Sequence, residues 1–334
     1  MPARASEDGP LAQPLPDTEP RVVSLRFRDF DEFSASNGVL EIDFLQLASA
    51  PLDQRMLRVS LDRMVLMRGW ESTAYLTRSP NPPGISTLLF QLVTTGESLW
   101  RGHVVDQGSL LSYQGGAEHV ARSTGGSVWA AIFFQADALR ESSLALRGVI
   151  PALHPSGAAF LEPDPTAHGA LRCAVQQAFL VAESAPELLE TPSVRRSLEE
   201  AILMAAISAI DPQHERMTPE GPLISHQRVV SRAEEALADR IDTPIYLADL
   251  CKAAGVSERT VRNSFQSLYN ISPIRFLHLR RLHQVRRTLR RDSKASVTAV
   301  ALRFGFGNLG RFAVEYRQLF GESPSHTRHA NRSG

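Results

Sequence analysis

Two stretches of the chain, Tyr246–Tyr269 (YLADLCKAAGVSERTVRNSFQSLY) and Val297–Phe320 (VTAVALRFGFGNLGRFAVEYRQLF), follow the same pattern. In both, an apolar helix ends at a glycine, and a second helix begins shortly afterwards at a polar residue. The shared positions are the glycine, the polar helix start and two apolar anchors: Gly255, Ser257, Val261 and Phe265 in the first copy, and Gly305, Asn308, Phe312 and Tyr316 in the second. A short helix, a glycine-marked turn and a second helix are typical of a helix-turn-helix unit. The pattern therefore predicts two such units in tandem, joined by an arginine-rich helix.

The composition is that of an ordinary globular protein. The 334 residues leave room for about two domains, and 43% apolar and 22% charged residues are typical values. The longest apolar stretches fall far short of the roughly 20 residues that a membrane span needs, so no membrane partner is expected. Residues 1–20 are rich in proline and acids without an apolar core, which predicts a disordered tail rather than a signal peptide.

The two cysteines, Cys173 and Cys251, fall in different predicted domains. This spacing argues against a disulfide framework and against a cysteine metal site. A reducing, cytoplasmic location is therefore expected.

The charge is divided unevenly along the chain, although its total is zero. Residues 223–334 hold 19 Lys and Arg against 9 Asp and Glu, a balance of +10 that leaves −10 for residues 1–222. A basic block on a neutral chain indicates a polyanion partner for that block. A solvated charged surface is the alternative, and the repeated motif favours the polyanion.

The segment from residue 21 to about 165 has the pattern of β structure. Short apolar runs are separated by Gly, Pro, Asn and Ser clusters, and Leu57, Val59 and Leu61 alternate with polar residues. This predicts a sandwich or barrel. Residues 166–211 instead have apolar positions at helical spacing, which predicts two antiparallel helices.

The remainder of the chain is predicted to be a polar linker over 212–222 and an all-helical domain over 223–330. Helices are expected near 225–240, 245–254, 257–269, 273–291, 296–304, 308–320 and 323–329.

A set of residues in the two units and in the helix between them recurs in a known order: Leu247, Ala248, Gly255, Val256, Ser257 and Phe265, then Ile271–Pro273 and Leu279–Leu282, then Ala301, Gly305, Phe306, Phe312, Tyr316, Phe320, Gly321, Ser323 and Pro324. In these residues the segment 223–330 resembles the DNA-binding domain of AraC-type (AraC/XylS) transcription regulators. The resemblance implies two helix-turn-helix units on one rigid helix, reading adjacent major grooves. It also implies transcriptional activation, and an effector-sensing or dimerising domain over 21–211. The run 310–325 is similar to the subgroup that contains ethanolamine-utilisation regulators.

The second helix of each unit, 257–269 and 308–320, carries the candidate DNA-binding residues. They are Ser257, Arg259, Thr260, Arg262, Asn263 and Gln266 in the first helix, and Asn308, Leu309, Arg311, Glu315 and Arg317 in the second. Arg can donate two hydrogen bonds to guanine, and Asn can pair with adenine, so Arg259, Arg262 and Asn263 are the expected base readers. Contact with phosphate is the alternative for the arginines.

The second recognition helix departs from the family pattern. Gly310 and Val314 stand where many family members have serine and arginine. We therefore expect this helix to position the protein on DNA more than it specifies a sequence. For the arginines of the connecting helix, two roles are weighed equally. They can cover core edges or pair with acids, or they can lie near phosphate. These residues are Arg275, Arg280, Arg281, Arg286, Arg287, Arg290 and Arg291.

The run 104–123, VVDQGSLLSYQGGAEHVARS, is similar to the cupin-like effector domains attached to AraC-type regulators. A cupin metal site needs several His residues and a carboxylate, whereas only His103 and His119 occur nearby, so neither a metal nor a cofactor is expected. The candidate effector-binding residues are Trp100, Tyr113, His119 and Trp129. Ordinary core packing is the alternative for the aromatic residues.

Together these observations predict an α+β chain: a cupin-like β-sandwich or barrel with a helical hairpin, followed by an all-α double helix-turn-helix domain. The predicted function is an effector-responsive, sequence-specific transcription activator. Its expected partners are promoter DNA, an unknown small-molecule effector, RNA polymerase and a second copy of the chain. Two alternatives stay open, a cupin-type enzyme fused to a DNA-binding domain and an architectural DNA-binding protein. The motifs of common enzyme classes do not occur in the sequence.

Overall fold

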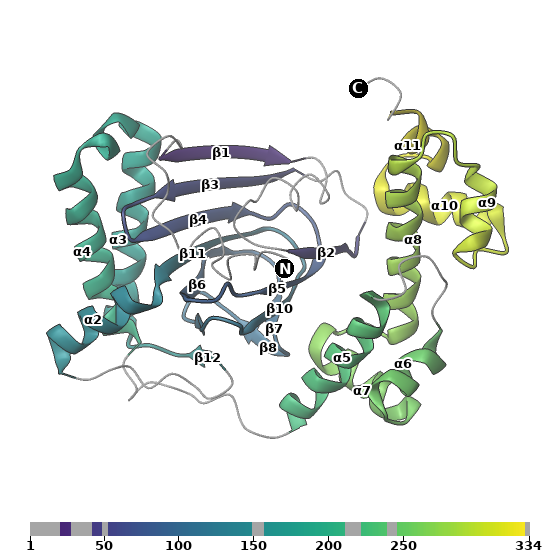
Figure 1. Cartoon of the computed structure of the whole chain (residues 1–334), viewed down its shortest axis with the longest axis horizontal. Coiled ribbons are helices and arrows are strands. Elements are labelled where there is room, and N and C mark those ends of the chain that lie inside the picture. Colours follow the sequence, from purple (N-terminus) through teal and green to yellow (C-terminus); the bar gives the residue numbers. More distant parts are fainter. Residues whose placement is uncertain are drawn as a thin grey trace, which may run out of the picture.

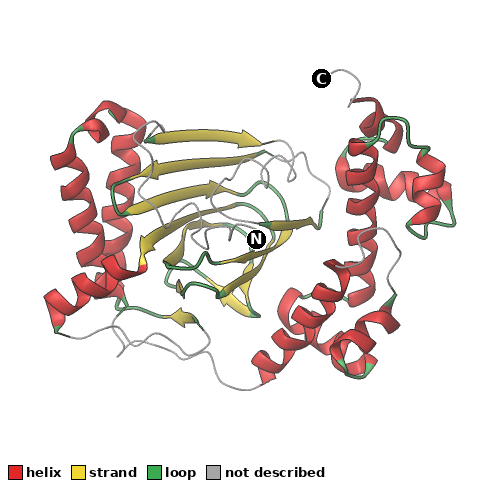
Figure 2. Ribbon diagram, viewed as in Figure 1, coloured by secondary structure: helices red, strands yellow, loops and turns green. Residues whose placement is uncertain are grey.

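The computed structural model describes residues 21–27, 42–48, 53–148, 157–210, 222–238 and 246–330. Figures 1 and 2 show a β domain with helices on one side and an all-helical domain on the other. The predicted fold class is confirmed: two antiparallel sheets with a helical hairpin, then helices alone. The predicted tail over 1–20 and the linker over 212–221 lie outside the described residues, while Pro222, predicted to end the linker, begins a helix.

Two antiparallel sheets form the β domain. The larger has the order β1 (Val22–Phe27), β3 (Gln54–Ser60), β4 (Met64–Trp70), β11 (Ser127–Gln135), β6 (Ile85–Thr94), β9 (Leu110–Tyr113) and β12 (Ala158–Leu161). The smaller has the order β2 (Asp43–Gln46), β5 (Tyr75–Pro80), β10 (Glu118–Ser123), β7 (Ser98–Trp100) and β8 (His103–Val105).

The larger sheet is buried on both faces, because successive side chains of a strand point to opposite sides. In β3, Leu57 and Val59 belong to the cluster that packs under helices, whereas Met56 belongs to a second cluster. That second cluster also contains Phe44 and Tyr75 from the smaller sheet. The domain is thus a sandwich whose larger sheet separates a helical layer from the space between the sheets.

The helical layer consists of α3 (Pro165–Ser184), a 3-10 turn (Pro186–Glu190) and α4 (Pro192–Ala209), which pack as the predicted antiparallel hairpin. Asp164 begins α3: its Oδ1 accepts hydrogen bonds from the backbone N–H groups of Thr166 at 2.9 Å and Ala167 at 3.1 Å. A further helix, α2 (Ala136–Arg147), follows β11 directly and lies inside the segment predicted to be β-rich.

The C-terminal domain begins with α5 (Pro222–Ala238). The first helix-turn-helix unit is α6 (Leu247–Ala254) with α7 (Glu258–Tyr269), and the second is α9 (Val297–Arg303) with α10 (Leu309–Phe320). Between them runs α8 (Pro273–Arg291), and α11 (Pro324–Ala330) follows the second unit. No helix among the described residues is long and apolar enough to span a membrane.

The turns of both units form for the reasons that the sequence suggested. Gly255 and Gly305 have φ values of 68° and 83°, in the left-handed region that glycine adopts without strain. Ser257 and Asn308 then cap the recognition helices, since their side chains accept hydrogen bonds from the backbone N–H groups of Thr260 at 3.3 Å and Arg311 at 2.9 Å. The predicted anchors are all buried: Val261, Phe265, Phe312 and Tyr316.

Candidate nucleic-acid interface and cavity

The outer face of α7 carries the polar side chains that the sequence singled out. Arg259, Arg262, Asn263 and Gln266 are exposed, while Val261 and Phe265 on the opposite face are fully buried. Phe265 packs edge-to-face against Phe276 of α8, with ring centroids 5.0 Å apart. This packing fixes the direction in which the exposed face of α7 points. Ser257, at the helix start, is also exposed, whereas Thr260 is half-buried.

Two of these polar groups already have partners along α7. The Nε of Arg262 donates to Glu258 Oε1 at 2.8 Å, one helical turn earlier. Gln266 donates its side-chain N–H to Asn270 Oδ1. Such exposed pairs along a helix are worth only about 0.2–0.5 kcal/mol, so they can be exchanged for contacts with a ligand.

The corresponding face of α10 is less polar. Arg311 is exposed and donates to Glu315 at 2.9 Å, and Glu315 also lies 3.1 Å from His278 of α8. Arg317 is exposed, and Leu309 and Val314 expose 37% and 57% of their surface. An apolar side chain thus stands on this face at position 314, where the family pattern suggests an arginine.

The arginines of α8 do not form one exposed row. Arg280 lies 2.5 Å from Asp43 of the β domain, and Arg286 donates to Glu322 at 3.1 Å. The guanidinium of Arg281 lies over the Tyr246 ring, 4.8 Å from its centroid. Arg275 and Arg291, at the two ends of the helix, are exposed. Several arginines of α8 therefore contact acidic or aromatic side chains of the protein itself.

A cavity of about 110 Å³ lies between the two sheets of the β domain. All four predicted effector-binding residues line it: Trp100, Tyr113, His119 and Trp129. A water-sized site needs about 10–15 Å³, so this space has the size of a small organic molecule. Most of the remaining lining is apolar, including Ile42, Phe44, Met67, Leu89 and Phe133.

One carboxylate, Glu71, contributes to the cavity lining. Burial raises its pKa, and hydrogen bonds from Ser123, Tyr75 and Trp129 partly offset that shift. Burial also lowers the pKa of His119 to about 4, so its ring is neutral near pH 7. The His119 Nδ1 and the Tyr113 hydroxyl share a hydrogen bond. The cavity therefore offers polar groups that are already satisfied by neighbours, within an apolar wall.

The lining also contains polar atoms that have no hydrogen-bond partner among the described residues. Among them are the side-chain carbonyl of Gln91 and the hydroxyl of Ser98, and both residues are nearly fully buried. A buried polar atom without a partner is costly, so these atoms mark where a ligand could accept or donate a hydrogen bond. Within the described ranges, no group of three or more His, Cys, Asp or Glu side chains could hold a metal ion.

Comparisons with known proteins place the helical domain in a family. The family model described as a helix-turn-helix domain matches residues 250–330. The probable thc operon regulatory protein of Rhodococcus erythropolis is 33% identical over 143 residues, 42% of this chain and 43% of that protein. The XylDLEGF operon transcriptional activator of Pseudomonas putida is 38% identical over 105 residues, 31% of this chain and 32% of that protein.

This chain is similar to these transcription regulators over its helix-turn-helix domain. It spans less than half the length of the two curated relatives named above. A solved structure, the AraC-like transcriptional activator CuxR, covers 79% of this chain and 94% of its own length, at 12% identity and a TM-score of 0.44.

Some residues of the cavity and of the recognition helix were not predicted from the sequence. Glu71, Tyr75 and Phe44 line the cavity, yet they come from the end of β4, from β5 and from β2, and they carry no local motif. Glu258 pairs with Arg262, and this pairing has a readable signal, because an acid four residues before an arginine on a helix is a favourable spacing.

Proposed function

We propose that this protein is a sequence-specific DNA-binding transcription activator that responds to a small molecule. The observation that carries the proposal is the pair of helix-turn-helix units, each with a buried anchor row and an exposed recognition face, on one connecting helix. The 19 residues of α8 span about 28 Å, close to the roughly 34 Å between successive major grooves on one face of DNA. Two recognition helices joined in this way suit neighbouring grooves.

On α7, we propose that Arg259, Arg262 and Asn263 read bases. All three are exposed on the face opposite the anchors, and their donor patterns fit guanine or adenine. The other candidate residues of this helix, Ser257, Thr260 and Gln266, would contact phosphate or neighbouring bases.

On α10, we propose a role mainly in positioning. Arg311 and Arg317 would contact the DNA backbone, while Leu309 would lie against a thymine methyl group. Asn308 and Glu315 complete the predicted set on this helix. The exposed Val314 supports the smaller share in sequence reading, because it offers no hydrogen bond.

The proposed effector site is the cavity between the sheets. Its lining favours a small, largely apolar and uncharged molecule with at least one hydrogen-bonding group. Among the described lining residues the cationic side chain is Arg122, and its guanidinium already pairs with Glu97, so a ligand carboxylate would have to compete for it. We also propose that the chain forms a homodimer through the α3–α4 layer, where Leu180 and Met204 expose 53% and 57% of their surface. A further proposed partner is RNA polymerase, in the cytoplasm.

The test is selection of random duplex DNA by the purified full chain. A recurrent sequence with two elements one helical turn apart is the expected result. Recovery of unrelated sequences would refute sequence-specific binding. Repeating the selected-site titration with ethanolamine and with small neutral aromatic compounds tests the effector class: ethanolamine is the ligand that the proposed subgroup suggests, and the aromatic compounds suit the apolar lining. An affinity that moves with neither kind of compound would remove the effector site from the proposal.

A further inference from the structure

The smaller sheet of the β domain has two different neighbours, one on each face. Its strands β2, β5 and β10 lie side by side in a single layer, with β2 at the edge. Side chains of a strand alternate between the two faces, so neighbouring residues in sequence must face different environments. In this sheet one environment is the cavity and the other is the helix-turn-helix domain.

The cavity face is formed mainly by alternate residues of these strands, although Pro80 and Arg122 also contribute to the lining. Phe44 of β2, Tyr75 and Thr77 of β5, and His119 and Ala121 of β10 all line the cavity. Phe44 pairs across the strands with Thr77. Phe44 and Tyr75 also pack edge-to-face, with ring centroids 5.2 Å apart. Because these rings form part of the cavity wall, a molecule that fills the cavity presses directly on β2 and β5.

The residues between them pack against the helical domain. Leu45, Leu76 and Val120 belong to the same buried cluster as the anchors Val261 and Phe265. Leu45 and Leu76 are direct cross-strand partners, as are Asp43 and Arg78. The opposite face of the wall is therefore continuous with the core of the DNA-binding domain.

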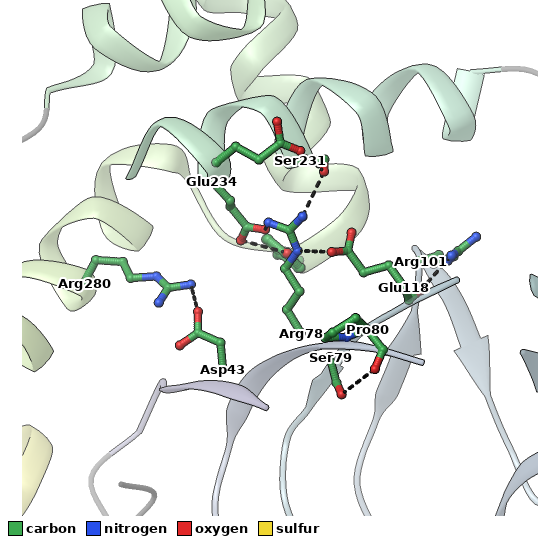
Figure 3. Close-up of polar contacts among 11 residues, drawn as sticks. Asp43, Arg78, Ser79, Pro80, Arg101, Glu118, Ser231, Glu234 and Arg280 are labelled. Carbon is green, nitrogen blue, oxygen red and sulfur yellow. Dashed lines mark hydrogen bonds and ion pairs between the residues drawn. The ribbon is translucent and has the colours of Figure 1, made fainter. Parts of the chain in front are cut away.

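Charged groups join the wall to both α5 and α8 (Figure 3). Arg78 donates to Ser231 at 2.9 Å and lies 3.2 Å from Glu234, both on α5, and it is held from its own sheet by Glu118. Glu234 in turn accepts a hydrogen bond of 3.0 Å from the hydroxyl of Tyr269, at the end of the recognition helix α7.

At the edge of the sheet, Asp43 lies 2.5 Å from Arg280 and 3.7 Å from Arg287. Burial alone would raise the pKa of Asp43, but the charge and hydrogen bond of Arg280, together with Arg287, hold it below its usual value. Asp43 is therefore ionised near neutral pH and attracts the middle of α8.

Gln46, at the other end of β2, reaches both α8 and the second unit. Its backbone N–H donates to His283 Nε2 of α8 at 3.2 Å. Its side-chain N–H donates to the backbone oxygen of Leu319 in α10 at 2.9 Å. Three of the four residues of β2 thus pack against or bond to the helical domain, namely Asp43, Leu45 and Gln46, while Phe44 faces the cavity.

From this two-faced arrangement we infer that the sheet β2–β5–β10 is a shared wall that couples filling of the cavity to the orientation of the DNA-binding domain. Asp43 and Arg78 act as positioning residues, since they hold α8 and α5 on the wall without being part of the recognition faces. The inference rests on the proposed function for its consequence, a change in DNA affinity. Its structural part, a change in how the two domains are held, stands independently.

The coupling can be tested without knowing the ligand, by filling the cavity with protein atoms. Ala131, on the larger sheet, is buried and lines the cavity from the side away from the helical domain. Ala131→Leu adds volume there, and Ala131→Val is a smaller step in case the larger side chain disturbs folding. Asp43→Asn removes the ion pairs at the wall with little change in shape. Asp53→Asn is the matched control, because Asp53 pairs with Arg26 and Arg55 on the other sheet.

The readout is the distance between nitroxide labels in the two domains of the full chain. One label goes on the exposed Cys173 of α3 and the other on a cysteine introduced at the exposed Gln318 of α10, with Cys251→Ser to avoid a third label. We expect both Ala131→Leu and Asp43→Asn to shift or broaden the distance distribution, and Asp53→Asn to leave it unchanged. In a chain that already carries Asp43→Asn, the addition of Ala131→Leu should change the label distance less than the same substitution does in a chain with Asp43.

The same variants are then titrated with the selected DNA site. Coupled sites typically change affinity by about 5- to 150-fold, so an effect of about fivefold or more is expected for Ala131→Leu and for Asp43→Asn. Unchanged distances in folded Ala131→Leu and Ala131→Val proteins would overturn the shared wall, even if DNA binding were normal. Changed distances in a protein without any preferred DNA site would instead refute the proposed function and leave the wall intact.

Discussion

Replacement of Arg259 by alanine gives the sharpest prediction about DNA recognition. The side chain is exposed near the start of α7, beyond the cap at Ser257, and α7 is fixed from behind by the packing of Phe265. A bidentate contact with guanine is worth about 1–3 kcal/mol of discrimination, which corresponds to roughly a 5- to 150-fold increase in Kd for Arg259→Ala. Folding stability should hardly change, because the side chain is exposed.

The assay is a titration of a fluorescent duplex carrying the selected site, repeated over a range of salt concentrations. Loss of a base contact should relax the preference at one base pair and leave the salt slope almost unchanged, whereas loss of a phosphate contact should weaken all sequences alike and reduce the slope by about 1. Arg140→Ala, an exposed arginine of α2 in the β domain, is the matched control. An unchanged Kd and footprint for Arg259→Ala would refute the assignment of α7 as the base-reading helix.

Three further predictions concern the same domain. Glu258→Gln should raise the affinity for the selected site by a few tenths of a kcal/mol or more, because Arg262 then binds DNA without first breaking its ion pair with Glu258. Weaker binding in the same titration would contradict this. Phe265→Ala should lower the free energy of unfolding in urea by about 3–5 kcal/mol, as expected for a fully buried aromatic side chain, and a loss below about 1 kcal/mol would show that the anchor is dispensable. Burial and nearby arginines lower the pKa of His283 to about 3. The folded protein therefore keeps this imidazole neutral at pH values where the unfolded chain protonates it. The resulting contribution to the free energy of unfolding is fully present above about pH 6.5 and is lost as the pH falls toward 3. His283→Gln should therefore make the unfolding free energy less dependent on pH in that window, and an unaltered pH profile would argue against the buried neutral imidazole.

The sequence predicted the helical domain well, because its signals are local. Gly255 and Gly305 mark the turns, Ser257 and Asn308 mark the helix starts, and the predicted connecting helix has the bounds of α8, Pro273–Arg291. A helix boundary set by a cap or by a left-handed glycine depends on a few neighbouring residues, so it can be read from the chain.

The β domain was predicted only as a class. Alternation at Leu57 and Val59 indicates strands, yet the pairing of β2 with β5 and the helix α2 directly after β11 were not foreseen. Strand order depends on contacts between distant segments. The helix α2 begins at Ala136, and the preceding Gln135 provides no side-chain cap, so the usual start signal does not occur there.

The site was predicted in part for the same reason. Trp100, Tyr113, His119 and Trp129 were expected at a ligand site from residue type and position, and they line one cavity. The fate of Arg280 was not predictable, because its partner Asp43 lies far away in sequence and belongs to the other domain. Among the arginines of α8, tertiary contacts alone decide which remain available for phosphate.

Two rigidly joined recognition helices should occupy neighbouring major grooves of one duplex. Hydroxyl-radical footprinting of the full chain on its selected site measures whether they do. We expect two protected segments on the same face of the DNA, about one helical turn of 10–10.5 base pairs apart, and Arg259→Ala should weaken only the segment occupied by α7. A single protected segment, or uniform protection of random DNA by well-folded protein, would contradict it.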